Sequence, residues 1–247
     1  MISFTEDCYF DVNIFLEILW KESKNNSHNK CWEKSVKCLN HHKLKCYSSD
    51  FGLLILNYKL YGQWEDFTNI LIKAKTVEEI RNLTNKYPGK ETIKIFITNL
   101  IEKIEKEYWS INDAITYLIK MRLREFHDEI RNLYKNLYFI NTNIRWYMRK
   151  IELKKEDDVC LLSVSGKKDI IIPLGDPRIS LIHERIKRLK ACLEQDEDRV
   201  NYAIAKTVMM KYFLTRDSEF FEGKTIACIE RQGLDYIATT PEKLLEI

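Results

Sequence analysis

Residues 9–19 read YFDVNIFLEIL, and residues 47–56 read YSSDFGLLIL. In each stretch a short segment that is expected to be a strand ends at an aspartate, Asp11 or Asp50. Apolar residues at helical spacing follow that aspartate. Strands that alternate with helices in this way are typical of a parallel sheet. We therefore expect strands near residues 7–12 and 44–48, a helix behind each, and an α/β fold whose central parallel sheet is flanked by helices.

The C-terminal part of the chain repeats the alternation of strands and helices. A helix is expected from Asp198 to Met210, a strand at 212–215 and another at 224–229, and Thr240-Pro241-Glu242 begins a final helix. Because strands separated by helices occur near both ends, we expect them to join one sheet of about four or five strands.

The middle of the chain differs in composition and predicts a separate region. Gly62 is expected to end the helix that starts at Asp50, and residues 76–85, 91–107 and 110–150 show helical spacing with many charges and aromatic rings. Residues 158–164 and 169–174 resemble two strands of a β-hairpin around Gly166-Lys167-Lys168. The expected organisation is one domain of residues 1–75 and 166–247, interrupted by a mainly helical insertion at 76–165.

Length and composition exclude several classes of protein. The 247 residues, 45% of them hydrophobic, suffice for a buried core, and a net charge of +3 does not by itself imply nucleic-acid binding. No apolar run reaches the roughly 18 to 20 residues of a membrane span, and the N-terminus lacks the basic region of a signal peptide. We therefore expect no membrane partner, a cytoplasmic location, and seven reduced, mostly buried cysteines.

Four aspartates are candidates for a shared site: Asp11, Asp50, Asp198 and Asp217. Asp11 and Asp217 follow short apolar strands, and sites in parallel sheets form outside the carboxyl ends of strands. Asp50 and Asp198 begin helices, where the helix dipole favours an anion, and any one of the four acids alone could be only a helix cap. If all four converge, their repulsion requires a cation, and oxygen ligands favour Mg²⁺ or Mn²⁺. This pattern indicates metal-assisted hydrolysis of phosphodiesters.

The same stretches resemble motifs of the PIN-domain (PilT N-terminus) ribonuclease family. FDVNIFLEIL resembles the opening strand and helix, YSSDFGLLIL the second acidic motif, and DRVNYAIAK and FLTRDSEFF the third and fourth motifs. TTPEKLL at the end is similar to the terminal helix of the family. The resemblance covers residues 5–75 and 170–247, and the helical insertion is atypical for the family.

The resemblance implies an endoribonuclease that uses Mg²⁺ or Mn²⁺ held by the four aspartates to cut RNA. Asn13 and Thr215 would orient carboxylates or a phosphate, and Glu219 would be a further ligand or supporting group. Two alternatives remain open. One is a toxin-type ribonuclease restrained by an antitoxin, and the other is a catalytically inactive scaffold that binds RNA or protein. Members of the family often form homodimers, which makes a second copy a possible partner.

Residues 116–155 carry ten basic and four acidic side chains, with tyrosines and a tryptophan between them. Cations neutralise phosphates and aromatic rings stack on unpaired bases, so this segment could bind RNA. An ordinary helical segment whose basic face is exposed to solvent would give the same pattern. The candidate RNA-binding residues are Arg122, Arg124, Arg131, Arg145, Arg149 and Lys150.

Two further patterns suggest other chemistry. Arg122 and His127 have the Arg-x4-His spacing that resembles the metal-independent ribonuclease motif of HEPN domains, but a solvated helix face with a partly buried His explains this short pattern better. His28, Cys31, Cys38 and His41 resemble paired zinc ligands. However, Cys31 and Cys38 are seven residues apart and would share the buried face of one helix.

Overall fold

The computed structural model describes residues 6–23, 30–142, 167–173 and 175–246. Contacts between residues divide the chain into two compact units. The first, the sheet unit, consists of Met1–Phe15, Lys37–Tyr58 and Tyr134–Ile247, and the second, the helical unit, consists of Leu16–Val36 and Lys59–Leu133. The boundaries of these two units are defined by contacts between residues. The boundaries predicted at residues 75 and 166 instead lie where the composition of the sequence changes.

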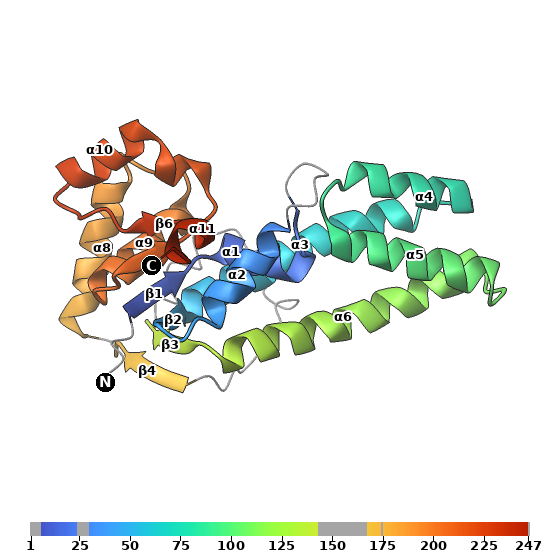
Figure 1. The fold of residues 1–247 in the computed structure, drawn as a ribbon, viewed down its shortest axis with the longest axis horizontal. Helices are drawn as coiled ribbons and strands as arrows, with labels where there is room; N and C mark the ends of the chain where they lie inside the picture. Colours follow the sequence, from blue (N-terminus) through green and yellow to red (C-terminus); the bar gives the residue numbers. More distant parts are fainter. Residues whose placement is uncertain (1–5, 24–29, 143–166, 174, 247) are drawn as a thin grey trace. The chain divides into compact units, whose positions relative to one another are not determined.

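The sheet unit is built on a parallel sheet, which confirms the expected α/β class (Figure 1). Among the described residues it has six strands in the order β4-β3-β2-β1-β5-β6, and every neighbouring pair is parallel. The strands are β1 (Glu6–Phe10), β2 (Leu44–Ser49), β3 (Tyr138–Asn141), β4 (Lys167–Ile171), β5 (Tyr212–Leu214) and β6 (Ala238–Thr239).

Helices flank this sheet, and several begin where the sequence predicts. The helices and the 3-10 turn that begin in this unit are α1 (Val12–Trp20), α3 (Asp50–Leu71), α8 (Pro177–Leu189), α9 (Asp196–Thr207), η1 (Ser218–Phe221), α10 (Gly223–Arg231) and α11 (Pro241–Leu244). Asp176 caps α8 by accepting from the Arg178 N–H, and Thr240 caps α11 by accepting from Lys243 N. Each cap satisfies an otherwise unpaired backbone donor.

The core of the sheet unit lies around its central strands. Tyr9 of β1 stacks on Phe213 of β5 at a ring-centroid distance of 5.7 Å, and both rings are fully buried. Tyr202 of α9 and Phe220 of η1 pack against Phe213 at 5.2 Å each. Because β1 is paired on both sides and covered by helices, its last three residues are all buried, which is typical of a central parallel strand.

The helical unit contains α4 (Val77–Lys86), α5 (Glu91–Glu105) and most of α6 (Ile111–Lys135). The chain also passes through it in parts of α1, α3 and α2 (Cys31–Leu39). Its core is an aromatic cluster in which Trp64 contacts Trp20, Phe67, Phe96 and Phe126 at 5.1–6.3 Å. Such rings bury large apolar areas, so they supply much of the stability of the unit.

Three sequence-based expectations about elements are wrong. Helix α3 continues through Gly62, because a mid-helix glycine costs only about 1 kcal/mol and the buried stripe of Leu60, Trp64 and Leu71 continues past it. The helix predicted over 110–150 ends at Lys135, and the strand β3 follows. The strand predicted at 224–229 is helix α10, whose buried residues Thr225 and Ile229 are four apart.

The expected hairpin falls partly outside the described residues. Lys167 and Lys168 are strand residues of β4 and not a turn, and β4 pairs with β3 in parallel. Its predicted partner strand, 158–164, lies in the part of the chain that is not described. No helix among the described residues is both long enough and apolar enough to cross a bilayer.

Candidate functional site at the carboxyl edge of the sheet

The strand order creates a topological switch point between β1 and β5. From β1 the chain first adds β2 on one side of the sheet and later adds β5 on the other side of β1. In open parallel sheets, ligands bind outside the carboxyl ends of strands at such a point. Asp11 directly follows β1, Asp50 directly follows β2, and Asp217 comes shortly after β5. Three of the four candidate acids therefore follow the carboxyl ends of neighbouring strands.

Asp11 is buried, with 2% of its surface exposed, and its carboxylate is held by several donors. Oδ1 accepts a hydrogen bond of 2.7 Å from the backbone N–H of Val12. Oδ2 accepts from Asn13 Nδ2 at 2.7 Å and from Thr215 Oγ1 at 2.8 Å. A buried acid is costly unless its oxygens are paired, so these donors compensate for the burial of Asp11.

Asn13 and Thr215 also join Asp11 to the loop after β5. Asn13 Oδ1 accepts from the backbone N–H of Arg216 at 3.0 Å, and its amide donates to Thr215 Oγ1 at 2.9 Å. Thr215 Oγ1 accepts in turn from the backbone N–H of Asp217 at 3.1 Å. The Asp217 side chain caps η1, since its Oδ1 accepts from Glu219 N at 2.9 Å. Residues that follow β1 and β5 thus form one polar network at the switch point.

A second branch of hydrogen bonds extends from Asp11 to β2 and α9. Asn201 of α9 places Nδ2 at 3.5 Å from Asp11 Oδ1, and its Oδ1 accepts from the Tyr9 hydroxyl at 2.8 Å. The Tyr9 hydroxyl also lies 2.7 Å from Ser49 Oγ at the end of β2. Burial raises the pKa of Tyr9 well above its ordinary value, and the nearby charges of Asp11 and Asp50 raise it further. Tyr9 therefore serves as a neutral hydrogen-bonding link.

The sequence did not single out Tyr9, Ser49 or Asn201. Asn201 lies one helical turn after Asp198, so it shares a face of α9 with that candidate acid. This spacing was the available signal for Asn201. Tyr9 and Ser49 lie on different strands, and their contact depends on the register between β1 and β2. A short strand offers no sequence signal for that register.

Asp50 and Asp198 are the candidate acids that lie in the first turns of two helices, α3 and α9. Asp50 Oδ1 accepts from Thr142 Oγ1 at 2.6 Å, from Thr142 N at 3.1 Å and from the N–H of Phe51 at 2.9 Å. Asp50 therefore joins the start of α3 to the chain just after β3. Asp198 is 5% exposed in the first turn of α9, where the helix dipole favours its charge.

The geometry does not gather the four aspartates into one metal cage. Within the described ranges, no group of three or more His, Cys, Asp or Glu side chains is close enough to hold a metal ion. Carboxylate and amide oxygens suit Mg²⁺ or Mn²⁺ in chemical type. In this structure the oxygens of Asp11 accept hydrogen bonds from protein donors instead. The metal site at Asp11, Asp50, Asp198 and Asp217 stays a prediction.

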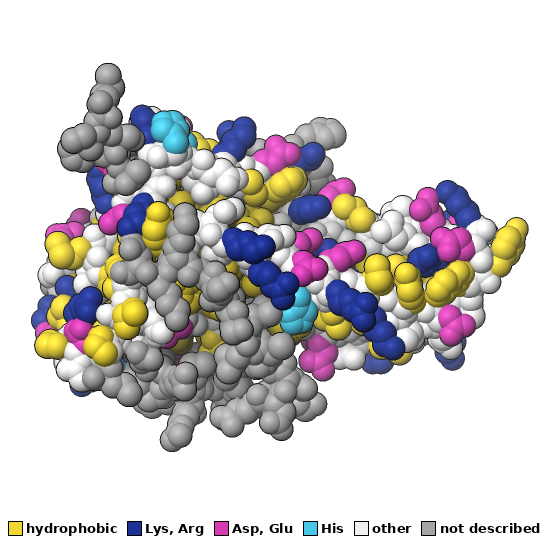
Figure 2. All heavy atoms as spheres, turned by 90° about the horizontal axis from the view of Figure 1, so that it is seen from below, with side chains coloured by type: hydrophobic (Ala, Val, Ile, Leu, Met, Phe, Trp, Pro, Cys, Tyr) yellow, Lys and Arg dark blue, Asp and Glu magenta, His cyan; other side chains and the backbone are white. Residues whose placement is uncertain are grey.

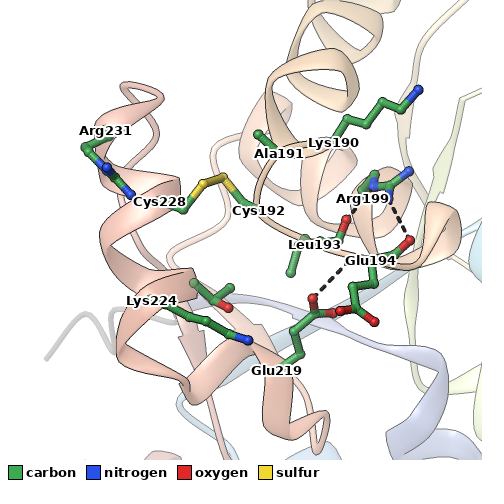
Figure 3. A pocket seen from close by; sticks show the side chains of 11 residues that line it. Lys190, Ala191, Cys192, Leu193, Glu194, Arg199, Glu219, Lys224, Cys228 and Arg231 are labelled. Carbon is green, nitrogen blue, oxygen red and sulfur yellow. Dashed lines mark hydrogen bonds between the residues drawn. A yellow bond between two sulfur atoms is a disulfide. The ribbon is translucent and has the colours of Figure 1, made fainter.

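Glu219 lies beside a cavity of about 540 Å³ in the sheet unit (Figure 3). Its Oε1 accepts from the backbone N–H of Glu194 at 2.9 Å. Burial raises the pKa of Glu219; the Glu194 N–H opposes this rise, and the charge of Asp217 adds to it. The residues lining the cavity are Lys190, Ala191, Cys192, Leu193, Glu194, Arg199, Glu219, Lys224, Thr225, Cys228 and Arg231.

The candidate RNA-binding residues are described in part. Arg122 is largely enclosed, because it donates to Glu125 and Glu129 and lies 4.0 Å above the ring of Phe126. Arg124 and Arg131 are exposed. On the described part of the face in Figure 2, basic side chains are mixed with acidic and apolar ones. Arg145, Arg149 and Lys150 lie outside the described residues.

The two minor patterns receive structural explanations. His127 Nε2 lies 2.9 Å from the Tyr61 hydroxyl, while the guanidinium of Arg122 is bound to acids on its own helix. Cys38 is buried and its thiol donates to the carbonyl of Pro241, and His28 lies outside the described residues. These contacts give His127, Arg122 and Cys38 structural roles.

The cysteines differ from the sequence-based expectation. Cys192 and Cys228 form a disulfide with a Cα–Cα distance of 5.5 Å, so the prediction that all seven cysteines are reduced is wrong for this pair. The two lie 36 residues apart, one in the turn after α8 and one in α10, and only the tertiary fold brings them together. Four other described cysteines are buried thiols outside any disulfide: Cys8, Cys31, Cys38 and Cys46.

Comparison with known proteins gives no relative, since no family model, curated protein or solved structure matches the chain.

Proposed function

We propose that this chain is a PIN-like endoribonuclease that depends on Mg²⁺ or Mn²⁺, with its active site at the carboxyl edge of the sheet. The observation that carries the proposal is the buried carboxylate of Asp11 at the switch point, hydrogen-bonded to Thr215 from the end of β5. An acid is costly to bury, and its position is where open parallel sheets bind ligands.

The neighbouring residues support a polar ligand at this edge. Asn13 and Thr215 fix the orientation of the Asp11 carboxylate, and Asp217 follows in the same loop. Asp50 lies at the end of the adjacent strand β2. The carboxylates of Asp11, Asp50 and Asp217 would hold a hard divalent cation, which would supply an activated water and charge neutralisation at the leaving oxygen of a phosphodiester.

The experiment for this proposal measures metal binding and cleavage separately. The full chain is titrated with Mn²⁺ by calorimetry and incubated with end-labelled single-stranded RNA, with and without EDTA. We expect Mn²⁺ to bind and RNA to be cut only in its presence. Cleavage that continues in EDTA, or an absence of both binding and cleavage, would contradict the proposal.

A second candidate function is favoured by a specific observation. Both carboxylate oxygens of Asp11 already accept hydrogen bonds from the protein, and no three acidic, His or Cys side chains of the described segments are grouped to hold a metal. This arrangement supports a catalytically inactive scaffold that binds RNA or protein. Fluorescence anisotropy with labelled RNA would then show binding that EDTA does not change, without any cleavage.

A further inference from the structure

The Cys192–Cys228 disulfide differs from the other described cysteines because it lines a cavity. Both residues are only partly buried and belong to the lining of the 540 Å³ cavity. By contrast, burial raises the pKa of the Cys8 thiol far above its ordinary value and that of Cys46 to about 12. Buried neutral thiols are inert, whereas a sulfur that faces a cavity can be reached by a small reagent.

The cavity carries more positive than negative side chains. Its cations are Lys190, Arg199, Lys224 and Arg231, and its acids are Glu194 and Glu219. Arg199 points into the protein, where it donates to the carbonyls of Leu193 and Glu194. The other three cations are exposed, so they remain accessible to a ligand from solvent.

Two of these cations lie on α10, the helix that carries Cys228. Arg231 is one turn after Cys228 on α10, and Figure 3 shows its side chain beside that cysteine. Lys224 is one turn before Cys228 and extends toward Glu219 in the same view. Its side chain is 80% exposed and pairs with Glu222 at 2.9 Å, which a competing anion can displace because exposed pairs are weak.

We propose that the Cys192–Cys228 disulfide is a thiol-exchange site, and that the cavity beside it receives an anionic low-molecular-weight thiol. The volume of about 540 Å³ lies within the range of small-molecule sites. The cations attract the carboxylates of such a thiol, while the disulfide in the wall offers the sulfur that reacts. This inference does not depend on the proposed nuclease function.

The exchange reaction balances without any further reactant. The thiolate of the small molecule attacks Sγ of Cys192, the protein S–S bond breaks, and a mixed disulfide forms at Cys192. Cys228 leaves as a thiolate, which Arg231 stabilises until it takes a proton from solvent. A second molecule of the thiol then attacks the mixed disulfide and departs as the oxidised small disulfide, which leaves both cysteines reduced.

Opening the disulfide removes a covalent connection near the candidate active site. Cys192 lies two residues before Glu194, whose backbone N–H donates to Glu219. Glu219 belongs to η1, the turn that Asp217 caps. Cys228 lies in α10, which follows η1 directly. After reduction, no covalent cross-link holds the turn to α10, so the exchange would loosen the segment that follows Asp217.

The test compares thiols of opposite charge on the folded, oxidised full-length chain. Glutathione, which is anionic, and cysteamine, which is cationic, are each added, and samples are quenched with an alkylating reagent. Peptide mass spectrometry then measures alkylation of Cys192 and Cys228. Each rate is divided by the rate of the same thiol with the neutral bis(2-hydroxyethyl) disulfide. We expect a corrected preference of about tenfold for glutathione, which high salt reduces.

The variants show whether the cavity causes this preference. Lys224→Gln combined with Arg231→Gln changes two exposed side chains, and should lower the ratio to about one while the circular dichroism spectrum is unchanged. Lys120→Gln, on the exposed surface of α6, is the matched control and should keep the full preference. Equal corrected rates in the unaltered protein would overturn the proposal. Cysteines that are already free, or that react only after denaturation, would overturn it too.

Discussion

The hydroxyl of Thr215 donates a hydrogen bond of 2.8 Å to the carboxylate of Asp11, although 204 residues separate them in sequence. Both residues are buried, Thr215 completely and Asp11 to 2% exposure. The bond joins the carboxyl end of β1 to that of β5 across the switch point of the sheet. It therefore connects the stability of the sheet unit to the orientation of its candidate functional acid.

Replacing Thr215 with valine should destabilise the protein. Valine keeps the shape of threonine but removes the donor, so the buried carboxylate of Asp11 loses one of its hydrogen bonds. We expect the free energy of unfolding to fall by about 1–3 kcal/mol. Chemical denaturation followed by circular dichroism measures this, with the exposed Thr98→Val as control. Equal stability of the two variants would show that the bond contributes nothing.

The Asp217→Asn variant separates a functional role of this acid from its capping role. Asparagine caps helices about as well as aspartate, so the start of η1 should be preserved. If Asp217 binds the cation, Mn²⁺-dependent RNA cleavage should fall by about 100-fold or more. Asp235→Asn is the matched control, because that side chain is 96% exposed in the same unit. Full activity of the Asp217 variant would remove it from the site.

The double variant Cys192→Ser, Cys228→Ser should unfold more easily than the oxidised protein. The disulfide closes a loop between residues 36 apart, and it restricts the unfolded chain. We expect a loss of about 2–4 kcal/mol in the free energy of unfolding. Adding a reductant to the unaltered protein should give the same loss and should not affect the variant. A reductant effect on the variant would point to a different cause.

The pH dependence of stability should include a contribution from Glu219. Its pKa is raised above the ordinary 4.5, mainly by burial, so the folded state binds its proton more tightly than the unfolded state. The stabilising contribution is full below the unfolded pKa and is lost as pH rises through the raised folded pKa.

Glu219→Gln therefore should be more stable than the unaltered protein at pH 7, and the difference should shrink toward pH 4. The glutamine carbonyl can still accept from the N–H of Glu194, so the hydrogen bond is kept. Thermal unfolding across this pH range measures the effect. Glu230→Gln, an exposed change on α10, is the control. A stability difference that grows as the pH falls would reverse the predicted sign.

Elements with strong local signals were predictable from the sequence. The first two strand–helix units follow from the apolar runs around Asp11 and Asp50, and the start of α11 follows from Thr240 and Pro241. Expectations failed where local signals were ambiguous. Residues 224–229 contain β-branched and apolar side chains that suit a strand, but burial of Thr225 and Ile229 against the unit selects a helix.

The sequence by itself determined the α/β class, because the period of apolar residues dictates whether a segment forms a strand or a helix. It also placed Asp11, Asn13 and Thr215 near strand ends. Only the tertiary structure decided that Thr215 and Asn201 meet Asp11, that Asp50 binds Thr142, and that Cys192 pairs with Cys228. Such contacts depend on which strands become neighbours, and that order arises from the packing of segments far apart in the chain, so no single segment shows it.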